Sequence, residues 1–104
     1  MPRTAARVDA NQAEIVRALR AIGASILYVH QLKGCFDILV GYRGKDYKFE
    51  IKASEKEKLT PGEAEFQRTW RGSPYHIVTS REQAIAIITA PTDTSRFLTD
   101  SRPH

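Results

Sequence analysis

The chain has 104 residues, of which 41% are hydrophobic and 27% are charged, the balance of a single globular domain. No apolar run approaches the ~18 residues of a membrane span, and no hydrophobic signal segment opens the chain. Cys35 is the single cysteine, so we expect a cytoplasmic protein without an intrachain disulfide. The net charge of +4 favours an anionic partner such as nucleic acid.

The first predicted element is a helix over residues 9–23, preceded by a polar tail at residues 1–8. Asp9 is the expected N-cap, and Gly23 is the expected stop. Apolar residues recur at helical spacing along this segment and predict its buried face: Ile15, Leu19 and Ile22.

Three strands are predicted next, from β-branched and aromatic runs at residues 25–32, 36–42 and 47–53. The turn "RGKD" joins the second strand to the third, and its glycine permits the tight bend. We expect Tyr42 to pair with Tyr47 across this turn.

A second helix is predicted over residues 59–72, with three start signals that agree. Thr60 suits the N-cap, Pro61 suits the first helical position, and Glu63 completes a T-x-x-E capping box. Trp70 lies on the same helical face as the phenylalanine four residues before it, so we expect it to anchor the helix.

The end of the chain contains one more strand and one more helix. Residues 75–80 form the predicted strand, Ser80 caps the last helix, and residues 90–104 form a polar tail. The order α-β-β-β-α-β-α predicts an α/β or α+β domain over residues 9–89, with a mixed central sheet flanked by helices.

Three charged residues interrupt the apolar runs of the second and third strands: Asp37, Glu50 and Lys52. Side chains alternate between the two faces of a strand, and the expected register puts Asp37 opposite Lys52, so all three project from one face. Because an unpaired buried carboxylate costs several kcal/mol, such a group needs an explanation.

Two carboxylates at this spacing suit Mg²⁺ or Mn²⁺, whose remaining positions are filled by water and phosphate. A bound cation makes water more acidic, and a neighbouring ammonium can stabilise charge on a phosphate, which is phosphodiester hydrolysis in outline. The alternative is a cross-strand Glu–Lys pair that stabilises the sheet by ~0.2–1 kcal/mol. Spacing alone leaves both interpretations open.

The blocks "GCFDILVGY" and "YKFEIKAS", preceded by "NQAEIVRALRAIGA" and followed by "LTPGEAEFQRTWRGSPYHIVTS", resemble the PD-(D/E)XK nuclease superfamily. The resemblance covers residues 7–89 and points to the small VRR-NUC and Holliday-junction-resolvase-like branch, which bacteriophages often carry. It implies a restriction-endonuclease-like αβββαβ core and a Mg²⁺-dependent endodeoxyribonuclease. It also implies a homodimer that acts on branched or flapped DNA.

The resemblance also implies roles for individual residues. Asp37 and Glu50 would be the metal-ligating carboxylates, with the main-chain carbonyl of Ile51 as a further ligand. Lys52 would be the catalytic lysine. Glu14, on the first helix, matches a glutamate that many resolvase-like members direct at the metal or its waters.

Two positions depart from the family pattern. Phe36 stands where a proline usually precedes the aspartate, and Glu63 stands where relatives have glutamine in Leu-Thr-Pro-x-Gln. The proline is not a ligand, so the chemistry survives its loss, whereas Glu63 changes the local charge and leaves the metal preference open.

Several residues near the catalytic strands could form a rim that holds a DNA backbone, although such a residue taken alone is more often an ordinary solvated surface residue: Lys33, Gly34, Lys45, Lys56, Lys58, Arg68 and Arg71. Two other functions remain open at this point. One is a non-catalytic nucleic-acid-binding or regulatory domain that retains the fold, and the other is a structural partner protein with a buried ion network.

Overall fold

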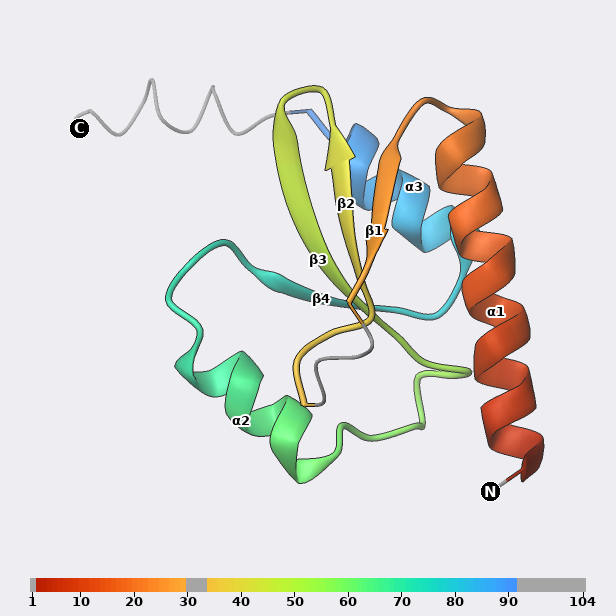
Figure 1. The fold of residues 1–104 in the computed structure, drawn as a ribbon, viewed down its shortest axis with the longest axis vertical. Helices are drawn as coiled ribbons and strands as arrows, with labels where there is room; N and C mark the ends of the chain where they lie inside the picture. The colour runs from red at the N-terminus through yellow and green to blue at the C-terminus, as the bar shows by residue number, and fades with distance from the viewer. Residues whose placement is uncertain (1, 30–33, 92–104) are drawn as a thin grey trace.

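The computed structural model describes residues 2–29 and 34–91. Along the chain, its helices and strands are α1 (Pro2–Ala21), β1 (Ser25–Tyr28), β2 (Ile38–Tyr42), β3 (Lys45–Ile51), α2 (Pro61–Thr69), β4 (Tyr75–Val78) and α3 (Arg81–Thr89) (Figure 1). The predicted order of elements and the predicted α+β class with a mixed sheet are confirmed.

The four strands form one sheet in the order β1-β2-β3-β4. The first three strands are antiparallel neighbours, and β4 runs parallel to β3. A parallel pair needs a crossover connection, and the segment containing α2 supplies it.

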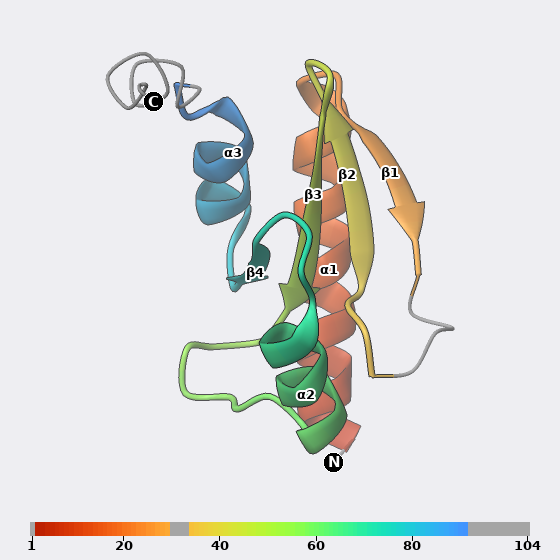
Figure 2. The ribbon, with the colours of Figure 1, turned by 90° about the vertical axis from the view of Figure 1, so that its left-hand side faces the viewer.

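Helices α1 and α3 contact each other and pack against one face of the sheet (Figures 1 and 2). The core lies between them and the strands, and it consists of Ile15, Val16, Leu19, Ala24, Ile38, Val40, Phe49, Ile51, Val78, Ala84 and Ile88. The opposite face, which we call the open face, is not covered by these two helices. Helix α2 lies below the lower end of the sheet in Figure 1, and none of its residues is fully buried.

The first helix is longer than predicted. It begins at Pro2, so Asp9 lies inside it and is not its N-cap, and the predicted tail is wrong for residues 2–8. Proline suits the first helical position, and no glycine interrupts the chain before Gly23. The helix ends as predicted, because Gly23 adopts φ 100° and its N–H bonds to a carbonyl of the last turn.

The buried face of α1 differs by one residue from the prediction. Ile15 and Leu19 are fully buried, but Ile22 is 37% exposed and Val16 takes its place in the core. Ile22 follows the last helical residue, so it no longer lies on the helical face.

The hairpin between β2 and β3 is tighter than predicted. Tyr42 pairs with Lys45, not with Tyr47, which pairs with Val40. Arg43 and Gly44 form a two-residue turn with φ 52° and φ 80°, the left-handed conformation that favours glycine. The register therefore shifts by two residues, and the predicted pairing of Asp37 with Lys52 is wrong, because Asp37 lies opposite Glu50. Because the strand period is two, every side chain still keeps its predicted face.

The predicted starts of the last two helices are confirmed. Thr60 and Glu63 form a reciprocal capping box with Pro61 at the first helical position, and the Ser80 side chain accepts a hydrogen bond from the Gln83 amide. Residues 92–104, most of the predicted C-terminal tail, lie outside the described residues. Among the described residues, no helix is long and apolar enough to cross a membrane.

Candidate metal centre

The candidate centre begins where the pairing of β2 with β3 ends. Ile38 and Phe49 are the last paired residues, and Asp37 and Glu50 follow directly beyond them. The Asp37 amide donates to the Phe49 carbonyl, and a carboxylate oxygen of Asp37 accepts the Ile51 amide at 2.7 Å. The main chain thus fixes the Asp37 carboxylate against the end of β3.

Glu50 and Lys52 project from the open face and are nearly inaccessible, with exposed fractions of 3% and 6%. The Lys52 ammonium lies 3.3 Å from Glu50 Oε2 and 2.9 Å from Glu63 Oε1. The same Glu63 oxygen also accepts the Thr60 amide of the capping box at 2.9 Å. One carboxylate oxygen therefore joins the start of α2 to the candidate catalytic lysine.

The two acids at this centre are crowded. Burial, followed by the negative charges of Asp37 and Glu63, raises the pKa of Glu50 to about 8. Burial also raises the pKa of Asp37, although the amide of Ile51 opposes part of this effect. The raised pKa values mean that the protein alone does not fully compensate the negative charges of these two carboxylates.

Lys52 and Glu63 are shifted in the opposite sense. Burial lowers the pKa of Lys52, but the hydrogen bond to Glu63 and the charges of Glu50 and Glu63 outweigh it, so the pKa is raised. Burial raises the pKa of Glu63, but the Thr60 amide and Lys52 together lower it below its usual value. This pair is therefore charged in both partners.

Tyr75 is a member of this centre that sequence reasoning missed. Its hydroxyl lies 3.4 Å from Glu50 Oε1 and 3.2 Å from the carbonyl of Cys35. Burial, followed by the charges of Glu50 and Glu63, raises the pKa of Tyr75, which keeps the hydroxyl a donor. A tyrosine at the start of a strand gives no local signal of this contact, because β4 reaches β3 only through the crossover.

The donor set fits a hard divalent cation. Within residues 2–29 and 34–91, no group of three or more His, Cys, Asp and Glu side chains is arranged to hold a metal by itself. Magnesium sites, however, use one or two carboxylates and complete their coordination with water and substrate phosphate. Asp37 and Glu50 supply such a pair, and their crowding is the electrostatic condition that a cation relieves.

Comparison with known proteins agrees with this geometry. A solved structure described as a VRR_NUC domain matches the chain with a TM-score of 0.61 and 26% sequence identity, covering 82% of this chain and 98% of that chain. The chain has a VRR_NUC nuclease-like fold. No protein-family model and no curated protein matches the sequence.

The two departures from the VRR-NUC pattern have visible consequences. The Phe36 ring packs on the Phe66 ring of α2 at a centroid distance of 5.7 Å. The residue in place of proline therefore makes a contact between α2 and the segment that precedes β2. Glu63, in place of glutamine, adds a third carboxylate beside Asp37 and Glu50 and pairs with the lysine.

Glu14 is placed differently from the other three candidates. Its carboxylate lies 3.4 Å from the Arg81 guanidinium at the start of α3. The α1 side chain that reaches the end of β3 is Asn11, whose amide donates to the main-chain carbonyls of Lys52 and Thr79 at 2.9 and 2.8 Å. A role for Glu14 at the metal stays a prediction.

The predicted DNA-binding residues are spread over three regions. Lys45 is in the hairpin at the far end of β3, Lys56 and Lys58 are exposed in the loop before α2, and Arg68 is paired with Glu65 at 2.7 Å. The remaining members follow: Gly34 packs against the backbone of Gly62, Arg71 is exposed after α2, and Lys33 lies outside the described residues.

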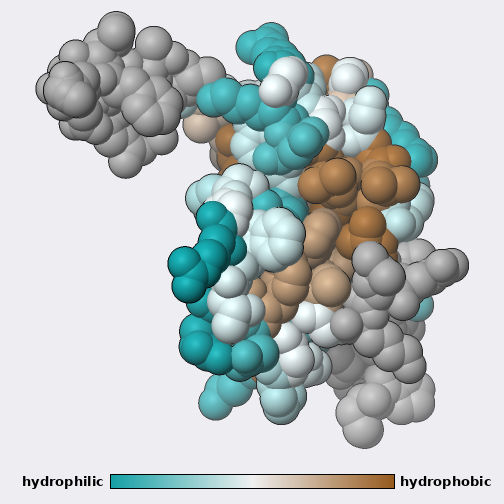
Figure 3. Space-filling model, turned by 60° about the vertical axis from the view of Figure 1, so that its left-hand side comes forward, coloured by the Kyte–Doolittle hydropathy of each residue, from teal (hydrophilic) through white to brown (hydrophobic). Residues whose placement is uncertain are grey.

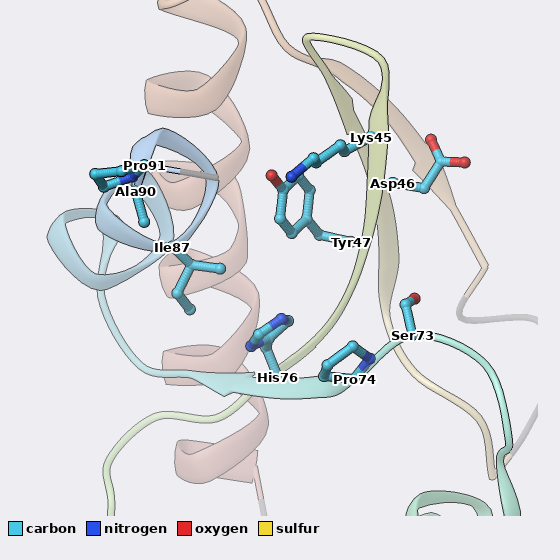
Figure 4. Close-up of a pocket in the computed structure, with 9 residues that line it drawn as sticks. All are labelled: Lys45, Asp46, Tyr47, Ser73, Pro74, His76, Ile87, Ala90 and Pro91. Atoms are coloured by element: carbon cyan, nitrogen blue, oxygen red, sulfur yellow. The ribbon is translucent and has the colours of Figure 1, made fainter. Parts of the chain in front are cut away.

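A cavity of about 320 Å³ lies away from the two acids (Figure 4). Tyr47, His76 and Ile87 line it, between β3, β4 and the end of α3. Tyr47 projects from the face of β3 opposite to Glu50, because adjacent side chains alternate. The cavity is therefore separated by the sheet from the candidate metal centre.

Proposed function

We propose that this protein is a Mg²⁺-dependent endodeoxyribonuclease that hydrolyses phosphodiester bonds with Asp37, Glu50 and Lys52. The observation that carries this proposal is the crowding of two carboxylates beside one buried lysine on the open face. Well-packed apolar residues would often stabilise such a position at least as well, so the pairing of buried Glu50 with half-buried Asp37 favours function over stability. The nuclease-like fold supports the same reaction class.

The carboxylates of Asp37 and Glu50 would hold Mg²⁺ or Mn²⁺, with the main-chain carbonyl of Ile51 as a further oxygen ligand and Glu14 as a contact to bound water. When bound, the cation supplies Lewis-acid stabilisation of the phosphate and a more acidic water. The Ile51 amide and the Tyr75 hydroxyl hold the two carboxylates in place beforehand.

Lys52 is the residue that acts on the phosphate. Its ammonium is held between Glu50 and Glu63, so its position is set before substrate arrives. From there it donates a hydrogen bond to a phosphate oxygen or to the attacking water, which stabilises negative charge that develops in the transition state.

We further propose that the substrate is branched or flapped DNA. The net charge of +4 favours contacts with the phosphate backbone, which fix the position of a protein on DNA but carry no sequence information directly. A homodimer would present one centre to each of two strands.

The test is a nicking assay on a branched duplex and on the matched linear duplex. We expect cleavage of the branched duplex with Mg²⁺ or Mn²⁺, none with EDTA, and a loss of at least about 100-fold in Asp37→Asn. Asp46→Asn is the matched control, because Asp46 is an exposed aspartate at the other end of the same hairpin. Equal activity of wild type and Asp37→Asn contradicts the proposal.

A non-catalytic nucleic-acid-binding domain is the second candidate, and one observation favours it. Lys52 already has the carboxyl groups of Glu50 and Glu63 within 3.3 Å, an arrangement that resembles a closed internal ion network. Thermal unfolding with and without Mn²⁺ or Ca²⁺ separates the two candidates. A metal-binding centre gains stability with the cation and loses that gain in Asp37→Asn, whereas a closed network gains none.

A further inference from the structure

Trp70 does not have the environment expected of a helix anchor. It follows α2 as its C-cap, and it is 48% exposed. Figure 3 shows that other apolar side chains gather over the β1–β2 pair of the open face, which includes the exposed Leu27. A single exposed aromatic residue is ordinary on a protein surface, so the contacts around Trp70 decide whether it has a role.

The indole of Trp70 is nevertheless held in one orientation. The Phe66 ring stacks on it at a centroid distance of 5.1 Å and an interplanar angle of 24°. The Lys48 ammonium lies 5.3 Å from the ring centroid. The main chain also passes closely, since a Cβ atom at Gly72 would come within 2.6 Å of the indole nitrogen. An exposed ring that is fixed in this way is preorganised for a ligand.

Lys48 adds a positive charge at the same place. Its side chain is only 5% exposed, and its ammonium donates to the Ser73 hydroxyl. It projects from the same face of β3 as Glu50, two residues away. Arg71, exposed directly after Trp70, adds a second cation.

A continuous set of contacts connects the indole with the candidate metal centre. Trp70 stacks on Phe66, and Phe66 contacts the Tyr75 ring at a centroid distance of 5.7 Å. The Tyr75 hydroxyl lies 3.4 Å from Glu50. The indole is therefore linked to Glu50 through the two rings of Phe66 and Tyr75.

We propose that Trp70 is a stacking site for an unpaired nucleobase of the DNA on which the metal centre acts. The inference rests on the proposed function and specifies its substrate as DNA with unpaired nucleotides next to the cleavage point. An unpaired base can offer its flat face to an indole, whereas both faces of a base inside a duplex are stacked on its neighbours. The Lys48 ammonium over the ring adds a positive charge that attracts the phosphates flanking such a base.

Trp70 is the sole tryptophan of the chain, so the emission excited at wavelengths that tyrosine does not absorb reports on this residue alone. The experiment titrates wild-type protein, in EDTA, with a duplex that carries a bulge of three thymidines. The comparison probes are the same duplex with three abasic nucleotides and the fully paired duplex. We expect the thymidine bulge to quench the emission and to bind about 5- to 150-fold more tightly than the abasic bulge.

Two variants, measured by the anisotropy of labelled DNA, test the assignment. Trp70→Leu should bind the thymidine and abasic bulges equally, whereas Trp70→Phe should retain part of the preference because it keeps an aromatic face. Leu27→Ala is the matched control, since it removes an exposed apolar side chain of the open face away from the indole.

Equal binding of the two bulges by wild type, an emission unchanged by DNA, or an undiminished preference in Trp70→Leu would overturn the inference. These outcomes are independent of catalysis, because no cation is present. A protein that cleaves branched DNA without base-dependent binding would refute the stacking site alone. A protein that shows the preference but never cleaves would refute the nuclease alone.

Discussion

Replacing Glu50 with glutamine should make the metal-free protein more stable near neutral pH. Burial and the neighbouring charges of Asp37 and Glu63 raise the pKa of Glu50 from 4.5 to about 8. Between these two values the folded protein holds a proton at Glu50 that the unfolded chain has released. Raising the pH through this window therefore favours unfolding of the wild type, and the amide of the variant has no such dependence.

The magnitude follows from the width of the window. A difference between 4.5 and about 8, at about 1.4 kcal/mol per pH unit, gives an upper limit of about 5 kcal/mol above pH 8. The variant also loses the ion pair with Lys52, which offsets part of the gain. We expect a net stabilisation of about 1–3 kcal/mol at pH 8.

Urea denaturation in EDTA, from about pH 5 to about pH 9, measures this effect. The free energy of unfolding of Glu50→Gln, minus that of the wild type, should increase up to about pH 8 and then level off. Glu65→Gln, an exposed glutamate of α2, is the control and should follow the wild type. A difference between Glu50→Gln and the wild type that does not change with pH would refute the reasoning, because Glu50 would then ionise normally in the folded state.

Four other substitutions test the contacts around the centre. Asn11→Ala removes two donors to main-chain carbonyls at the ends of β3 and β4 and should lower the free energy of unfolding by about 1–3 kcal/mol in urea. Tyr75→Phe should leave the fold intact but weaken Mn²⁺ binding in a thermal-shift titration, because the hydroxyl no longer positions Glu50. Thr60→Ala should lower the free energy of unfolding by about 1 kcal/mol, because the helix cap is lost. Glu63→Ala should lower it more, because it also removes the partner of the buried lysine. Equal losses in these two variants would contradict the shared role of the Glu63 carboxylate.

Signals that act within a few residues were read correctly from the sequence. The capping box of Thr60 and Glu63, the serine cap of α3 and the stop at Gly23 all depend on neighbours in the chain. The common face of Glu50 and Lys52 was also predictable, because a strand alternates with period two. That prediction survived an error of two residues in the hairpin register, since such a shift leaves every face unchanged.

The first helix differs from its prediction near both of its ends. The polar first residues read as a tail, but proline at the first helical position and the absence of a glycine let the helix begin at Pro2. Ile22 has helical spacing but lies beyond the last helical residue. In both cases the prediction failed on which residues the helix includes, although its periodicity was correct.

The partners of the charged groups depended on the tertiary structure alone. The crossover through α2 brings Glu63 to Lys52 and Tyr75 to Glu50, and it leaves Trp70 exposed beside Lys48. These contacts join residues that are separated by 11 to 25 positions, so no short sequence pattern encodes them. The sequence by itself determined which side chains face the same way, because periodicity is local. Which of them meet was decided by the packing of α2 and β4 against β3, because only the folded chain sets the distance between elements.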